Sequence, residues 1–164
     1  MAAEELKEFI GRTVETSVFE VEKEPIRRFA DAVGDMNPLY WDEEYARKSR
    51  HGSIIAPPGF ISSLWFTGRS VKWGPRERTT ESLGPPELMA ALARAGYRRI
   101  IDTGIDYEFF QPVKAGDAIS STTVVRDIME RGKDTKVAFL ITETTHTNQD
   151  GRVVAKARST TIHQ

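Results

Sequence analysis

The hydrophobic period of this chain changes at Gly96 and keeps its second form to the C-terminus. Before Gly96 several apolar runs recur at helical spacing, whereas after it apolar and polar residues alternate, which is typical of half-buried strands. Turns rich in Gly, Asn and Asp separate the later strands. Four consecutive antiparallel strands are predicted, over 101–109, 119–129, 136–147 and 152–162. Such a sheet must bury one face against another element, and a meander around a helix is the simplest closed arrangement.

The segment from Pro58 to about Gly68 is the predicted cover of that sheet. It is apolar on nearly all sides, and a helix of this kind belongs in the interior of a domain. No charge lies between Arg50 and Arg69, but prolines, glycines and serines interrupt the stretch, so a membrane span is not predicted. The other predicted elements are a strand over 13–23, helices over 25–33, 42–47 and 87–94, and a loop over 69–86. The order predicts an α+β fold in which an antiparallel sheet wraps around one central helix.

Length and composition favour one domain over residues 1–164, with a loop and short helix inserted at 69–96. The formal net charge of −1 argues against nucleic acid and membrane surfaces as partners. The chain has no cysteine, which excludes disulfides and thiolate chemistry and fits a cytoplasmic protein. The acidic N-terminus has no apolar run of the kind that a signal peptide needs.

Chemistry is expected at a loop that precedes the predicted central helix. The run Gly34-Asp35-Met36-Asn37-Pro38-Leu39 places a carboxylate among turn-forming residues. A second run, Ile54-Ile-Ala-Pro-Pro58, leads into the helix, and a third, Phe110-Gln-Pro-Val-Lys-Ala-Gly-Asp117, ends the first strand of the sheet and makes the next turn.

These three motifs, in this order, resemble the MaoC-like dehydratases and (R)-specific enoyl-CoA hydratases. The second run resembles the N-terminal branch of that family, the FAS1-like dehydratase domain. The resemblance covers residues from about Ile10 to Ile162 and implies the hotdog fold. It also implies syn addition of water across an enoyl thioester, or the reverse reaction. In the family an Asp and a His hold the water, and backbone N–H groups at the start of the helix polarise the thioester carbonyl.

This sequence departs from the family pattern at two places. Asp35 stands at the family's Asp, but Tyr40 stands at the family's His. A phenol with a pKa of about 10 shuttles protons poorly at neutral pH compared with an imidazole of about 6.5. At the helix start Pro58 has no N–H to donate, and Gly59 is the next available donor.

The resemblance implies two groups of site residues. The catalytic candidates are Asp35, Asn37 and Tyr40, and the substrate-binding candidates are Trp41, Ala56, Pro57, Pro58 and Gly59. The alternative interpretation treats Asp35 as a turn residue and Tyr40 as pocket wall, with Asp35 as the nearest hydrogen-bond partner for a buried Tyr40. His51 is another possible source of an imidazole. Neither a metal site nor a cofactor is predicted, and the acids of strand 101–109 are interpreted as a solvated face.

Three hypotheses remain open for the function. In the first, the chain binds an acyl-CoA or acyl-carrier thioester and pairs with a second hotdog subunit, which supplies the Asp and His. In the second, it is a self-sufficient homodimeric hydratase that uses Asp35 with Tyr40 or His51. In the third, it is an acyl-CoA-binding module without activity. Each version predicts a dimer whose sheets join into one.

Overall fold

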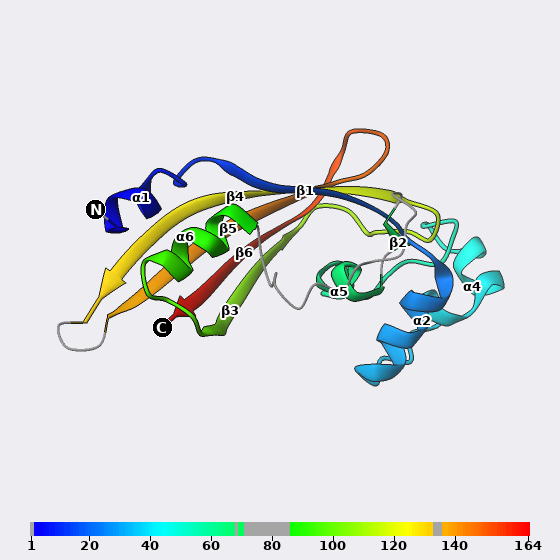
Figure 1. Cartoon of the computed structure of the whole chain (residues 1–164). Coiled ribbons are helices and arrows are strands. Elements are labelled where there is room, and N and C mark those ends of the chain that lie inside the picture. The colour runs from blue at the N-terminus through cyan, green and yellow to red at the C-terminus, as the bar shows by residue number, and fades with distance from the viewer. Residues whose placement is uncertain (1, 68, 71–85, 133–135) are drawn as a thin grey trace.

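A computed structural model describes residues 2–67, 69–70, 86–132 and 136–164 (Figure 1). Its framework is an antiparallel sheet with the strand order β2-β1-β4-β5-β6-β3. The strands are β1 Thr13–Glu20, β2 Arg69–Ser70, β3 Ile100–Phe109, β4 Ala118–Arg131, β5 Val137–Thr147 and β6 Val153–His163. The helices are α1 Ala2–Lys7, α2 Lys23–Ala32, α3 Pro38–Trp41, α4 Glu43–Lys48, α5 Phe60–Thr67 and α6 Pro86–Arg94. The predicted α+β class and the predicted strands are confirmed.

The predicted meander is correct for β4, β5 and β6 but wrong for β3. β3 pairs with β6 at the far edge of the sheet, and β4 pairs with β1 instead. β4 pairs with β1 because the turn between β3 and β4 is hydrogen-bonded to the residue that follows β1. Gly116 N–H donates to Val21 O at 2.8 Å, and Val21 N–H donates to Asp117 O at 2.8 Å. These two bonds place the start of β4 next to β1 instead of next to β3.

The helices differ from prediction mainly at their ends. α2 begins at Lys23, two residues before Pro25, while α4 begins as predicted with Asp42 accepting hydrogen bonds from the N–H groups of Glu44 and Tyr45. Neither α1 nor the four-residue α3 was predicted. Within the predicted loop 69–86, Arg69–Ser70 forms strand β2, and residues 71–85 lie outside the described residues. Among the residues that are described, no helix has the length and apolar character needed to cross a bilayer.

Two apolar clusters share one face of the sheet. The first surrounds α5, whose Phe60, Ile61 and Leu64 are buried together with residues of β1, β4, β6, α2 and the segment 54–56. The second lies at the other end of the long strands β4 and β5, where α1 and α6 pack (Figure 1). Its buried members are Leu6, Phe9, Leu88, Ala91, Leu92, Tyr97, Val125, Ile128, Ala138 and Leu140.

A polar seam separates the two clusters along β4 and β5. Ser121 and Thr123 lie between Ile119 of the first cluster and Val125 of the second, at alternate positions of β4. Ser121 Oγ and His146 Nδ1 are 2.8 Å apart, and the hydroxyls of Thr123 and Thr144 are 2.9 Å apart. Burial lowers the pKa of His146 from 6.5 to about 4, so its imidazole is neutral at physiological pH.

Candidate functional site

The loop that carries Asp35 is held by its own backbone and by Trp41. Asp35 N–H donates to Ala30 O at 2.9 Å, and the indole N–H of Trp41 donates to Asp35 O at 3.0 Å. The Asp35 carboxylate accepts the N–H of Asn37 at 3.1 Å, while the Asn37 side chain accepts the N–H of Leu39 at 3.1 Å and caps α3. Asp35 and Asn37 therefore shape the turn from which α3 begins.

Tyr40 lies on α3 with only 6% of its surface exposed. Burial raises the pKa of its phenol above 10, the negative charge of Asp35 raises this pKa further, and a hydrogen bond with the Asn37 side chain lowers it. Asp35, the predicted hydrogen-bond partner of the phenol, acts on its pKa through its charge. A phenol with a raised pKa stays protonated at neutral pH, so Tyr40 can donate a hydrogen bond but is a poor proton shuttle.

The segment 54–56 joins this loop to the lead into α5. Ile55 N–H donates to Leu39 O at 3.2 Å. On its other side, Ala56 N–H donates to Val113 O at 2.8 Å, and Ala115 N–H donates to Ile54 O at 3.0 Å. Three segments that are distant in sequence therefore meet next to the first turn of α5.

A pocket of about 330 Å³ opens where these segments meet. Its lining residues are Tyr40, Ile55, Ala56, Pro57, Pro58, Gly59, Ile61, Phe109, Phe110, Gln111, Pro112 and Val113. The structure thus brings Tyr40 together with all four residues predicted at the start of the helix. Asp35, Asn37 and Trp41 are not among the lining residues. Their hydrogen bonds hold together the loop and the short helix that carry Tyr40.

The wall formed by Phe109–Val113 was not predicted to belong to the site. The available signal was the run Phe110–Asp117, which was noted only as a motif of strand and turn. Phe109 stacks on Tyr107 with ring centroids 5.4 Å apart, and the Tyr107 hydroxyl hydrogen-bonds to Ser62 on α5. This contact links the edge strand β3 to the central helix.

The start of α5 leaves backbone donors unbonded near the pocket. Pro58 has no N–H, and the N–H groups of Phe60 and Ser62 bond to Pro57 O and Gly59 O. Within the described ranges the Gly59 N–H has no hydrogen-bond partner. Gly59 has a φ of +86°, a conformation that other residues adopt only with strain. Gly59 can therefore present an N–H to a carbonyl oxygen in the pocket.

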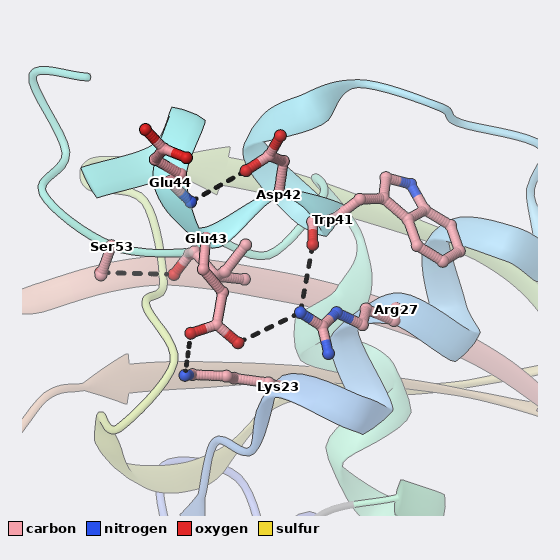
Figure 2. A network of polar contacts seen from close by, with 8 residues as sticks. Lys23, Arg27, Trp41, Asp42, Glu43, Glu44 and Ser53 are labelled. Atoms are coloured by element: carbon pink, nitrogen blue, oxygen red, sulfur yellow. Dashed lines mark hydrogen bonds and ion pairs between the residues drawn. The ribbon is translucent and has the colours of Figure 1, made fainter. Parts of the chain in front are cut away.

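A charged network fixes α3 against α2 (Figure 2). Arg27 Nη2 donates to Trp41 O at 3.1 Å and to Glu43 Oε1 at 3.2 Å, and Lys23 Nζ donates to Glu43 Oε2 at 2.7 Å. Because Trp41 follows Tyr40, Arg27 holds the C-terminal end of the helix that places the phenol. The pKa of Glu43 is lowered chiefly by Lys23, which keeps this carboxylate ionised.

The described histidines are all absent from the pocket lining. The carbonyl oxygen of His51 accepts a hydrogen bond from the Lys114 ammonium at 2.9 Å, and the His51 Nε2 lies 3.4 Å from Arg50 Nε. His146 is bonded to Ser121 inside the sheet, and His163 Nε2 lies 2.9 Å from the hydroxyl of Thr161. No group of three or more potential metal ligands occurs in the part of the chain that the structure describes.

Residues 8–157 match the family described as the FAS1-like dehydratase domain region. The chain belongs to this family. It is 33% identical over 135 residues to a "Probable enoyl-CoA hydratase alpha subunit" of Thermomonospora curvata, which covers 81% of this chain. The chain spans only 41% of that relative's length. It is also 33% identical over 121 residues to a "UPF0336 protein" of Streptomyces griseus, covering 73% of this chain and 71% of the relative.

Solved structures confirm the hotdog fold for this FAS1-like dehydratase domain. A crystal structure of the ChsH1–ChsH2 complex from Mycobacterium tuberculosis matches with a TM-score of 0.70 over 98% of this chain and 88% of that one. The sequence identity to it is 20%, so this likeness concerns the fold. The resemblance to MaoC-like dehydratases is thereby confirmed at the level of family and fold.

Proposed function

We propose that this chain is the acyl-binding half of an enoyl-CoA hydratase, in which a second hotdog subunit supplies the histidine. The reaction adds the hydroxyl of water to the β-carbon of an enoyl thioester and a proton to the α-carbon, or reverses this. The observation that carries the proposal is a mostly apolar pocket that has Tyr40 where a proton-shuttling histidine is expected.

The lining of the pocket supports an acyl thioester as the ligand. Its walls are aliphatic, proline and phenylalanine side chains, which suit a hydrocarbon chain. The donors available to a thioester carbonyl include the Tyr40 hydroxyl and the Gly59 N–H. These groups can bind and polarise the thioester, but neither accepts a proton from water near neutral pH.

Two observations support a second subunit: the described pocket residues include no group that can take a proton from water, and the sheet has an exposed edge. No histidine of the described residues lines the pocket, and the Asp35 carboxylate is engaged with its own loop. The relative from Thermomonospora is named an alpha subunit, and the ChsH1–ChsH2 structure is a complex. β3 lies at the edge of the sheet beside the pocket, where pairing with another sheet brings a second subunit within reach.

The test compares the chain alone with the chain bound to a histidine-bearing partner. The partner is a hotdog protein with the run Gly-Asp-x-Asn-Pro-x-His, sought first in the neighbouring reading frame. Hydration of crotonyl-CoA and longer enoyl-CoAs is followed by loss of the enoyl absorbance. We expect binding of saturated acyl-CoAs but no turnover by the chain alone, and turnover by the complex.

Substitutions assign the roles within that assay. In the complex, Tyr40→Phe is expected to weaken substrate binding, whereas replacing the partner's histidine abolishes turnover. Robust turnover by the chain alone that Asp35→Asn abolishes would contradict the proposal and favour a self-sufficient hydratase. Tight acyl-CoA binding without turnover in any combination would favour a binding module.

A further inference from the structure

Strand β3 is an exposed edge with an apolar component. It pairs with β6 on one side, and all its residues except Ile100 and Tyr107 are exposed. Ile101, Ile105 and Phe109 have 46%, 45% and 49% of their surface exposed. A ten-residue edge with free backbone groups and exposed apolar side chains is a surface on which another strand can add.

The same strand carries three carboxylates and no cation. Asp102, Asp106 and Glu108 are exposed, and none forms an ion pair within the described ranges. The β6 residues opposite Asp106 and Glu108 are Arg158 and Lys156. The Arg158 guanidinium binds Glu143 of β5 at 3.1 Å, and within the described ranges Lys156 forms no ion pair with Glu108. The edge therefore presents carboxylates that are not held in ion pairs to whichever strand lies beside it.

Antiparallel pairing of two copies about a twofold axis would set these carboxylates against one another. An axis at Asp106 places the two Asp106 side chains opposite each other. An axis at Tyr107 places Asp106 opposite Glu108, and an axis at Glu108 places the two Glu108 side chains opposite each other. Like charges directly opposite on neighbouring strands destabilise a sheet, whereas opposite charges stabilise it.

We infer that the β3 edge selects a different hotdog chain, whose edge strand carries lysine or arginine opposite Asp106 and Glu108, and disfavours a second copy of itself. The inference rests on the proposed function, because it names the chemistry of the subunit that completes the site. The apolar residues of β3 supply the contact area, and the carboxylates determine which partner is accepted.

One experiment supplies the basic partner by charge reversal. Wild type is mixed with an equal amount of the Asp106→Lys/Glu108→Lys variant, which carries a mass label, and native mass spectrometry counts the three dimers at low salt. We expect the mixed dimer to exceed its statistical share. We also expect the nearly isosteric Asp106→Asn/Glu108→Gln variant to self-associate about tenfold more tightly than wild type, measured by sedimentation velocity. Added salt should reduce both differences because it screens exposed charges.

The matched control reverses two exposed carboxylates that lie away from the edge, with Asp31→Lys/Asp150→Lys. This variant should mix with wild type in statistical proportions. Circular dichroism checks that each variant is folded. If Asp106→Lys/Glu108→Lys does not fold, the self-association of Asp106→Asn/Glu108→Gln provides the test.

Two results would overturn the inference. One is a wild-type homodimer as tight as that of the neutralised variant. The other is a homodimer that Arg98→Glu weakens, because an axis at Thr103 would pair Arg98 with Glu108 and satisfy the charge within a self-paired edge. Binding of saturated acyl-CoA is measured on the same samples. Failure of acyl binding therefore speaks against the proposed function, whereas indifference of pairing to charge speaks against the edge inference alone.

Discussion

The N–H of Ile55 donates a hydrogen bond of 3.2 Å to the carbonyl oxygen of Leu39, and through it the Asp35 loop and the lead into α5 share one backbone connection. Leu39 precedes Tyr40, and Ile55 precedes Ala56, so this bond joins the part of the pocket wall that contains Tyr40 to the part formed by the segment before α5. Neither part can shift without disturbing this bond. The phenol and the helix start consequently keep a fixed relation, as a site that orients a thioester requires.

Arg27→Met is predicted to loosen the helix that carries Tyr40. The substitution removes the bonds to Trp41 O and Glu43 but keeps an apolar stem of similar length. We expect a loss of about 1 kcal/mol in unfolding free energy from urea titration, together with a change in tryptophan fluorescence. Arg28→Met is the matched control, because Arg28 pairs with Glu24 on the exposed side of the same helix. Equal effects of the two substitutions would contradict a role for Arg27 in positioning α3.

His146 is predicted to make the fold sensitive to acid. Its pKa is about 4 in the folded chain and about 6.5 when unfolded, so the unfolded state binds more protons between these values. Its contribution to stability is complete above pH 6.5 and is lost as the pH falls toward 4, by up to about 3 kcal/mol. His146→Gln should flatten the unfolding free energy between pH 7 and 4. An unchanged slope in His146→Gln would show that protonation of His146 is not the cause of the acid sensitivity.

Glu15 is predicted to act in the opposite direction. Burial on β1 raises the pKa of its carboxyl from 4.5 to about 7. Its contribution is complete below pH 4.5 and is lost as the pH rises through 7. Glu15→Gln should therefore stabilise the chain at pH 8 by about 1–2 kcal/mol, after allowance for partial solvent screening. Glu20→Gln, on the same strand but exposed, serves as the control in the same thermal and urea titrations. A gain that is constant with pH would argue against ionisation as its cause.

Phe109→Ala is predicted to widen the acyl pocket. The ring forms part of the wall and is held by stacking on Tyr107. Calorimetric affinities for butyryl-, octanoyl- and branched acyl-CoAs should shift several-fold toward the bulkier chains, because the substitution adds space at little cost to the rest of the fold. Ile101→Ala, on the same strand but outside the pocket, controls for effects on pairing. A uniform loss of affinity for every acyl chain would indicate collapse of the wall instead.

Much of the fold follows from local sequence signals. Alternation after Gly96 is strong enough to place β3 to β6, and Asp42 is recognisable as the cap of α4. The position of β3 was not predictable, because strand order depends on the bonds between Val21 and residues 116–117, which join segments far apart in the chain. α1 was missed because Leu6 is the only strongly buried residue among residues 4–7 of the helix, the part whose burial is described, and the helix packs on α6.

The candidate site was partly predictable. Tyr40 and residues 56–59 were assigned to the site from contiguous motifs, and the structure places them in the lining of one pocket. Trp41 was expected at the substrate, but its indole is occupied by Asp35 O. The wall from Phe109 to Val113 was missed because its inward side depends on how the end of β3 turns over α5, which is a property of the assembled sheet.

The division of the interior into two apolar clusters affects how the molecule can open. Among the described residues, the polar seam at Ser121 and His146 lies between the cluster packed by α1 and α6 and the cluster around α5. The seam joins the two clusters by hydrogen-bonded hydroxyl and imidazole groups instead of packed hydrocarbon, so the unfolding of one cluster is weakly coupled to that of the other. Each end of the long strands can therefore fray on its own. Amide protons near Leu140 would then exchange with solvent without exposing Tyr40, and the pocket would remain intact while the end of the sheet under α1 and α6 opens.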